Sequence, residues 1–155
     1  MVAELDLGQV IEFMGRQRLD DVLTEVDVMV LTSISEGMPL VILECGAAGI
    51  PSVATDVGAC RELIMGNSLE TPALGAGGAI TPLSNPRATA EACVRLLSDP
   101  DHYADCSEAL KTRVEQYYNK TGQDAAYRGL YDRRMAAETR PTPLPPPSHL
   151  AEAAE

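Results

Sequence analysis

The pattern of apolar and polar positions along the chain predicts alternating strands and helices. Residues 28–31 form a short, partly β-branched apolar run, typical of a strand that is buried on both faces of a parallel sheet. The polar, glycine-containing segment 32–37 follows as a loop, and Pro39 suits the first position of a helix over 40–48. Residues 52–55 are the next strand. Together these elements form a strand–loop–helix–strand unit, which is a parallel crossover.

The same alternation continues on both sides of this unit. Asn85–Pro86 resembles a helix cap followed by the first helical residue, and 121–124 resembles a variant of the capping box. Tyr127, Leu130 and Tyr131 recur at helical spacing on the last helix, and such a stripe more often belongs to a core than to a ligand site. The further elements expected are strands at 10–13 and 79–81 and helices at 20–25, 60–65, 86–97, 101–118 and 121–138.

Two carboxylates stand out in the central unit. Glu36 lies in the loop before the 40–48 helix, and Glu44 lies in the helix itself. The unpaired N–H groups of a first helical turn suit a phosphate, whereas carboxylates suit hydroxyl donors such as those of sugar and ribose. Amides flanked by carboxylates therefore fit a nucleotide sugar. The alternative is that Glu36 is a solvated loop charge and Glu44 an ordinary helix-surface residue.

Composition narrows the classes of partner. The chain has 155 residues, enough for one domain with a core, and a net charge of −11, which argues against nucleic acid or an anionic membrane surface as partner. No apolar run reaches the length of a membrane span, and the first residues have neither the basic start nor the apolar core of a secretory signal. We therefore expect a cytoplasmic chain.

The residues that often carry other chemistries are not arranged for them. The four cysteines have no metal-ligand spacing, and we expect them to be small buried residues in a reducing compartment. His102 lies at a helix start and His149 in the tail, so neither is placed for general base catalysis. No metal and no cofactor is implied. The cysteines are Cys45, Cys60, Cys93 and Cys106.

The central motif resembles that of a known family. The run SEGMPLVILECGAAGIPSVATDVG carries a Glu, seven residues and a second Glu, here Glu36 and Glu44. It resembles the donor-site signature of the family 4 retaining glycosyltransferases, which have the two-domain GT-B architecture. The likeness extends from about residue 10 to residue 131, and within the family the wording TSISEG to ACRELI is most similar to the glycosyltransferases of Pel exopolysaccharide synthesis. Two departures are Cys45–Gly46, where Ala-Met is commoner, and Ser52, where Val is usual.

This resemblance implies a fold and a partial architecture. It implies an α/β fold in which residues 1–138 form part of a C-terminal, nucleotide-sugar-binding, doubly wound Rossmann-like domain. The order of such a sheet makes 10–13, 28–31 and 52–55 its third, fourth and fifth strands, so that the first two are missing. Strand 28–31 would then have an open apolar edge, with self-association as one consequence.

The resemblance also implies a site. Glu36 would be the catalytic-site residue that holds hydroxyls of the transferred sugar, and Glu44 would hold ribose hydroxyls. The amides of Gly37, Met38, Pro39 and Leu40 (Pro39 itself has no N–H) span the segment that would hold phosphate and sugar. The loop with Gly15, Arg16 and Gln17 would lie near the nucleobase, although Arg16 could equally be a solvated loop charge.

The function implied is donor binding in a transferase that moves a sugar from a nucleotide sugar, with UDP-sugar favoured, during exopolysaccharide synthesis. The acceptor polysaccharide would be held by a missing N-terminal domain, and the family's diphosphate-neutralising Arg and Lys would precede this sequence, so the chain alone is expected to be inactive. Two alternatives remain open. One is a non-catalytic nucleotide-sugar-binding or interaction module, and the other is part of a nucleotide-sugar epimerase.

The end of the chain differs in composition. Residues 139–155 contain the run PTPLPPP and a short Ala/Glu segment. Such a run favours extended polyproline II, and we expect this Pro-rich segment to be a disordered tail.

Overall fold

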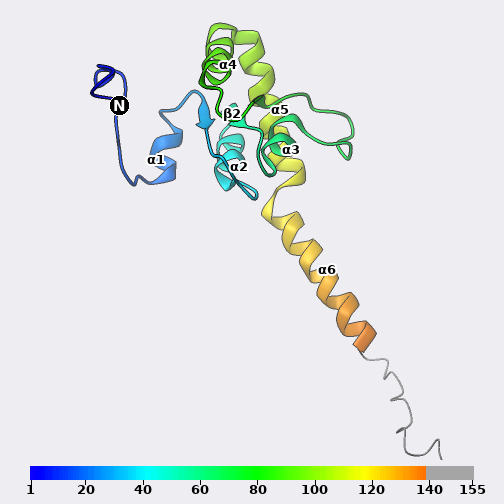
Figure 1. Cartoon of the computed structure of the whole chain (residues 1–155). Coiled ribbons are helices and arrows are strands. Elements are labelled where there is room, and N and C mark those ends of the chain that lie inside the picture. Colours follow the sequence, from blue (N-terminus) through cyan, green and yellow to red (C-terminus); the bar gives the residue numbers. More distant parts are fainter. Residues whose placement is uncertain (139–155) are drawn as a thin grey trace, which may run out of the picture. The chain divides into compact units, whose positions relative to one another are not determined.

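The computed structural model describes residues 1–138 of the chain (Figure 1). These residues divide into a unit over 1–118 and a second unit that begins at Asn119. The tail expected at 139–155 lies outside the described residues.

Three parallel strands form the sheet of the first unit. They are β1 (Met29–Leu31), β2 (Ser52–Thr55) and β3 (Gly78–Thr81), in the order β1-β2-β3. Leu31 pairs with Ala54 across the first pair of strands, and every pairing is parallel. The three strands expected at 28–31, 52–55 and 79–81 are confirmed to within one residue.

Helices follow the strands in the expected order. Asn85 caps α4 as its sequence suggested, because its side chain accepts a hydrogen bond of 3.0 Å from the Ala88 amide. The helix that carries Glu44 begins at Leu40 as expected and ends one residue earlier than expected, at Ala47, and Pro39 is its cap rather than its first helical residue. The helices of the first unit are α1 (Leu19–Leu23), α2 (Leu40–Ala47), α3 (Cys60–Met65), α4 (Pro86–Ser98) and α5 (Pro100–Tyr117).

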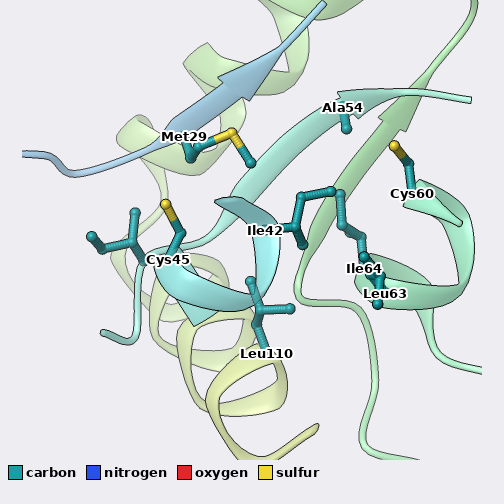
Figure 2. Close-up of a cluster of buried hydrophobic side chains, with 9 residues drawn as sticks. Met29, Ile42, Cys45, Ala54, Cys60, Leu63, Ile64 and Leu110 are labelled. Atoms are coloured by element: carbon teal, nitrogen blue, oxygen red, sulfur yellow. The ribbon is translucent and has the colours of Figure 1, made fainter. Parts of the chain in front are cut away.

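Apolar side chains cover both faces of the sheet. On one face Ala54 of β2 packs with residues of α2, α3 and α5 (Figure 2). On the other face Val53 packs with residues of α4 and α5. Because successive strand residues point to opposite faces, β2 is buried on both sides, which is typical of a parallel α/β sheet. The first cluster consists of Met29, Ile42, Cys45, Ile50, Ala54, Cys60, Leu63, Ile64 and Leu110, and the second of Val53, Leu96 and Cys106.

The cysteines occupy the core as expected. Cys45, Cys60 and Cys106 are buried, Cys93 is partly buried, and all four are free thiols. One polar side chain shares this environment: Ser52 is fully buried, and its hydroxyl has no hydrogen-bond partner among residues 1–138. An unpaired buried hydroxyl destabilises a fold.

Close helix packing depends on two glycines that face one leucine. A Cβ atom added at Gly46 of α2 would lie 2.9 Å from Leu110 Cγ and 2.8 Å from Val114 Cγ2. One added at Gly77 would lie 2.6 Å from Leu110 Cβ. Leu110 of α5 is fully buried between the two glycines, which sets how closely α5 can approach both α2 and the start of β3.

A buried ion pair fixes the loop between α3 and β3. Arg113 of α5 is fully buried and forms a forked pair with Glu70, whose side chain is only 6% exposed. The same guanidinium donates to the carbonyl oxygens of Ile64 at 2.9 Å and Gly75 at 2.5 Å. Arg113 thus joins the end of α3 to the loop over 66–77.

The strand expected at 10–13 is wrong. These residues have no strand structure and no partner in the sheet, and Val10 and Phe13 are 77% and 82% exposed. A short apolar run becomes a strand only when a neighbouring strand satisfies its backbone groups, and none lies beside it in the described residues. Within residues 1–138 the outer edge of β1 is unpaired, as the resemblance implied.

Helix α6 (Lys120–Glu138) belongs to the second unit and is described by itself. Its first turn is capped by Asn119, whose side chain accepts from the Gly122 amide at 2.7 Å, so the capping box expected at 121–124 is wrong. The aromatic stripe was expected in a core. Instead Tyr127, Leu130 and Tyr131 are 57%, 55% and 70% exposed.

Candidate functional site

The candidate site lies where β1 and β2 end. Because the two strands are parallel, the loops that leave them meet at one edge of the sheet, which is the usual ligand-binding edge of such folds. We name residues 32–39, after β1, the donor loop, and residues 55–59, at the end of β2, the supporting loop. The donor loop leads into α2, and the supporting loop leads into α3.

The two loops are in direct backbone contact. The Ala59 amide donates a 2.8 Å hydrogen bond to the Gly37 carbonyl oxygen. Gly58 has a positive φ of 51°, and a Cβ atom there would overlap the carbonyl oxygens of Glu36 and Gly37. The Thr55 hydroxyl donates to the Ser33 carbonyl oxygen at 2.5 Å. The donor loop therefore rests on the backbone of the supporting loop.

The expected donor-binding residues are gathered at the start of α2. Glu36 is partly buried, Glu44 is exposed, and neither side chain forms a hydrogen bond or ion pair among residues 1–138. Pro39 is buried and gives the helix no side-chain cap, so the first-turn amides are not occupied by a capping side chain. Two unpaired carboxylates and a helix start can bind a ligand with both phosphate and hydroxyl groups.

The thiols near these carboxylates are not activated. Burial, and to a smaller extent the charge of Glu44, raises the pKa of Cys45 to about 11. Burial also raises the pKa of Cys60, with smaller contributions from the charges of Glu36 and Asp56. Both thiols are therefore protonated at neutral pH, and neither is a nucleophile at this site.

The segment expected at the nucleobase is separate in its contacts. Gly15, Arg16 and Gln17 are exposed, and the Gln17 side chain donates to the Met14 carbonyl oxygen at 2.5 Å. Within residues 1–138, no hydrogen bond or ion pair joins this segment to the donor loop. Glu36 to Leu40 and Glu44 thus lie on the donor loop and the helix that follows it, whereas no described hydrogen bond joins 15–17 to them.

Sequence reasoning missed an ion pair beside the site. Asp56 follows β2, and its carboxylate accepts three hydrogen bonds from Arg61 of α3, the shortest of 2.5 Å. The Arg61 guanidinium holds the pKa of Asp56 below its usual range. The signal available was the five-residue spacing across a strand end, which is too common to single out the pair.

Two hollows of the first unit lie away from these carboxylates. One of about 470 Å³ is lined mainly by α5 and the loop at 74–76, and one of about 480 Å³ by β3, α3 and α4. They share Ala76 and His102, and neither includes Glu36 or Glu44. Within the described residues no three His, Cys, Asp or Glu side chains are grouped to hold a metal ion, and no helix is long and apolar enough to cross a membrane.

Comparison with known proteins decides the family. Residues 1–99 match the family described as "Glycosyl transferases group 1". The chain belongs to this glycosyl transferase family. Its α/β fold agrees, because the similar solved structures are GT-B glycosyltransferases.

Similar proteins and solved structures are consistent with this assignment. The chain is 30% identical over 135 residues to the lipopolysaccharide core biosynthesis mannosyltransferase LpsB of Rhizobium meliloti, covering 86% of this chain and 37% of that protein. The structure of sucrose-phosphate synthase from Thermosynechococcus elongatus superposes with a TM-score of 0.76 at 26% identity, over 88% of this chain and 33% of that one. Anabaena HepE in complex with UDP has the same fold, with a TM-score of 0.74 at 18% identity, over 85% and 35% of the two chains. This chain therefore spans about a third of the length of these glycosyl transferases.

Proposed function

We propose that this chain is the donor-binding portion of a retaining glycosyltransferase. In this proposal the donor is a nucleotide sugar, namely a UDP-sugar, and the transferase works in the cytoplasm to build an exopolysaccharide. The observation that carries the proposal is a pair of carboxylates without partners among residues 1–138. They lie around the start of α2, which has no side-chain cap, at the carboxyl edge of a parallel sheet. In a group 1 glycosyl transferase this edge is the natural place for the donor.

Each group has a chemical role in this proposal. Amides between Gly37 and Leu40 bind phosphate and sugar, since N–H groups at a helix start attract negative charge. Glu44 accepts hydrogen bonds from ribose hydroxyls, and Glu36 accepts them from the transferred sugar. A carboxylate beside the sugar also stabilises positive charge that develops there during transfer.

The choice of UDP and of exopolysaccharide rests on likeness. HepE, which shares the fold, was solved with UDP. The motif from 32 to 64 is similar to that of the Pel exopolysaccharide glycosyltransferases. Gly15, Arg16 and Gln17 remain proposed nucleobase neighbours, and their role requires the exposed segment over 1–18 to lie against the donor loop when the nucleotide is bound.

Calorimetry with UDP tests the proposal. Glu44→Ala should weaken binding, because it removes up to two charge-assisted hydrogen bonds worth about 1.5–3 kcal/mol each. Glu108→Ala, which removes an exposed α5 carboxylate outside the site, is the matched control and should bind as wild type. Equal affinity of wild type and Glu44→Ala would exclude the ribose role.

We propose that the chain by itself does not transfer sugar. Transfer needs an acceptor held against the donor, which is worth several kcal/mol of the barrier, and in the related proteins the matched segment is about a third of the whole. UDP release that depends on added acceptor and disappears in Glu36→Ala would contradict this. A non-catalytic nucleotide-sugar-binding module is the second candidate, because the same carboxylates and helix start can bind a nucleotide sugar without turnover. It predicts UDP-sugar binding with no turnover even when the rest of such a transferase is supplied.

The partner surface proposed is the unpaired edge of β1. Val30 in the middle of this strand is 46% exposed, and an apolar edge of this kind pairs with further chains. We expect the purified chain to self-associate, and Val30→Lys to reduce this. Size-exclusion chromatography over a range of concentrations measures it, and a concentration-independent monomer would contradict the proposal.

A further inference from the structure

We propose that Thr55 and Gly58 of the supporting loop are positioning residues for the donor site. They touch no ligand themselves in this proposal. They fix the donor loop so that Glu36 and the amides beside it are already in place when the donor arrives. The inference rests on the proposed function, and it assigns a role to two residues outside the Glu36–Glu44 segment.

The first contact comes from Thr55. This residue is only 5% exposed and ends β2. Its hydroxyl donates to the Ser33 carbonyl oxygen at 2.5 Å, two residues beyond the last paired residue of β1. The hydroxyl therefore extends the β1–β2 connection past the end of the strands and fixes where the donor loop begins.

The second contact comes from Gly58. With its positive φ and no side chain, it lets the backbone of the supporting loop touch the carbonyl oxygens of Glu36 and Gly37. Any Cβ atom at this position would push the two loops apart at Glu36 itself. Gly58 thus determines how far the Glu36 carboxylate lies from the edge of the sheet.

The hydrogen bond from Ala59 adds an orientation. It holds the Gly37 carbonyl oxygen toward the supporting loop at 2.8 Å. In a trans peptide the carbonyl and the following N–H point in opposite directions, so the Met38 N–H is turned away from the supporting loop. A donor amide oriented before binding costs no reorganisation when the ligand arrives.

The test uses the purified chain and two pairs of variants. Thr55→Val keeps the side-chain shape but removes the hydroxyl, and Thr55→Ser keeps the hydroxyl. Gly58→Ala adds the overlapping Cβ, while Gly75→Ala adds one at a glycine that also has positive φ but open space around it. The readouts are amide exchange at Ala59 by NMR, relative to the Leu110 amide within α5, and calorimetric affinity for UDP-glucose as probe.

We expect exchange at Ala59 to quicken about tenfold relative to Leu110 in Thr55→Val and Gly58→Ala, and UDP-glucose affinity to fall by a similar factor. Thr55→Ser and Gly75→Ala should resemble wild type in both readouts. Wild-type exchange at Ala59 in Thr55→Val and Gly58→Ala would overturn the inference, as would wild-type affinity despite faster exchange. A wild-type chain that binds no UDP-glucose contradicts the proposed function instead, and the exchange at Ala59 then still decides whether the supporting loop holds the donor loop.

Discussion

The donor loop and the loop over 66–77 each carry a glutamate, and the two carboxylates differ in whether the fold gives them a partner. Glu70 in the second loop is buried and fully paired, because Arg113 reaches it from α5. Glu36 in the donor loop is partly buried without a partner among residues 1–138, although its backbone is held by Gly58. Removal of the partner from a buried paired charge destabilises the fold, whereas a charge that the fold leaves unpaired is available to a ligand.

The largest effect expected from this contrast is on stability. Arg113→Met should destabilise the protein by about 3–5 kcal/mol, because it leaves Glu70 buried without its cation. Urea unfolding measures it. Lys111→Met, on an exposed position of the same helix, should stay within about 0.5 kcal/mol of wild type. If the two variants are equally stable, the paired Glu70 contributes no more to the free energy of unfolding than the unpaired Glu36.

A pH titration of stability sharpens the same point. Arg113 holds the pKa of Glu70 below its usual range, so the ionised form is favoured in the folded state. This stabilisation is fully present above the unfolded pKa of about 4.3 and is lost as pH falls through the lower folded pKa. The stability gap between wild type and Arg113→Met should therefore narrow from pH 7 to pH 3, and a constant gap would contradict the assignment.

Ser52 shows what an unpaired group does when no ligand can reach it. Its hydroxyl is buried and has no partner in the described part of the chain. Ser52→Ala should stabilise the protein by about 1 kcal/mol, since it removes an unsatisfied polar group at little cost in packing. Thermal unfolding with Ser107→Ala as control separates the effects, because the Ser107 hydroxyl donates to Gly49 at 2.6 Å and its loss should destabilise instead.

The smallest effect on stability is expected for the carboxylates of the candidate donor-binding site. Glu36→Ala should change the free energy of unfolding by less than about 0.5 kcal/mol, although it should impair binding of a UDP-sugar. Urea unfolding and calorimetry on the same sample test this pairing. A large loss of stability in Glu36→Ala would show that Glu36 stabilises the fold as Glu70 does, and would contradict the comparison of the two loops.

The sequence allowed part of this to be predicted. The strand at 52–55 and the helix at 60–65 match the structure residue for residue, because β2 is buried on both faces and its apolar character does not depend on neighbours outside the sequence. The run at 10–13 has a similar character, but it could not become a strand without a partner strand. Local pattern predicts what a segment can form, and pairing decides whether it does.

The sequence predicted the carboxylates of the site, but not the residues that hold the donor loop in place. Glu36 and Glu44 are visible because two carboxylates bracket a helix start. Thr55 and Gly58 were not singled out, because their contacts join residues about twenty positions apart and leave no periodic signal. Arg113 was missed for a related reason, since one arginine in a polar helix usually faces solvent.

The contact of Leu110 with Gly46 and Gly77 constrains how the family can vary. This chain has glycine at position 46, and Leu110 fills the space that a larger residue there would need. The three positions should therefore covary: lineages that gain volume at the position of Gly46 or Gly77 should lose it at that of Leu110. In an alignment of group 1 glycosyl transferases, the substitutions at these three positions should thus reflect how closely α5 packs against α2.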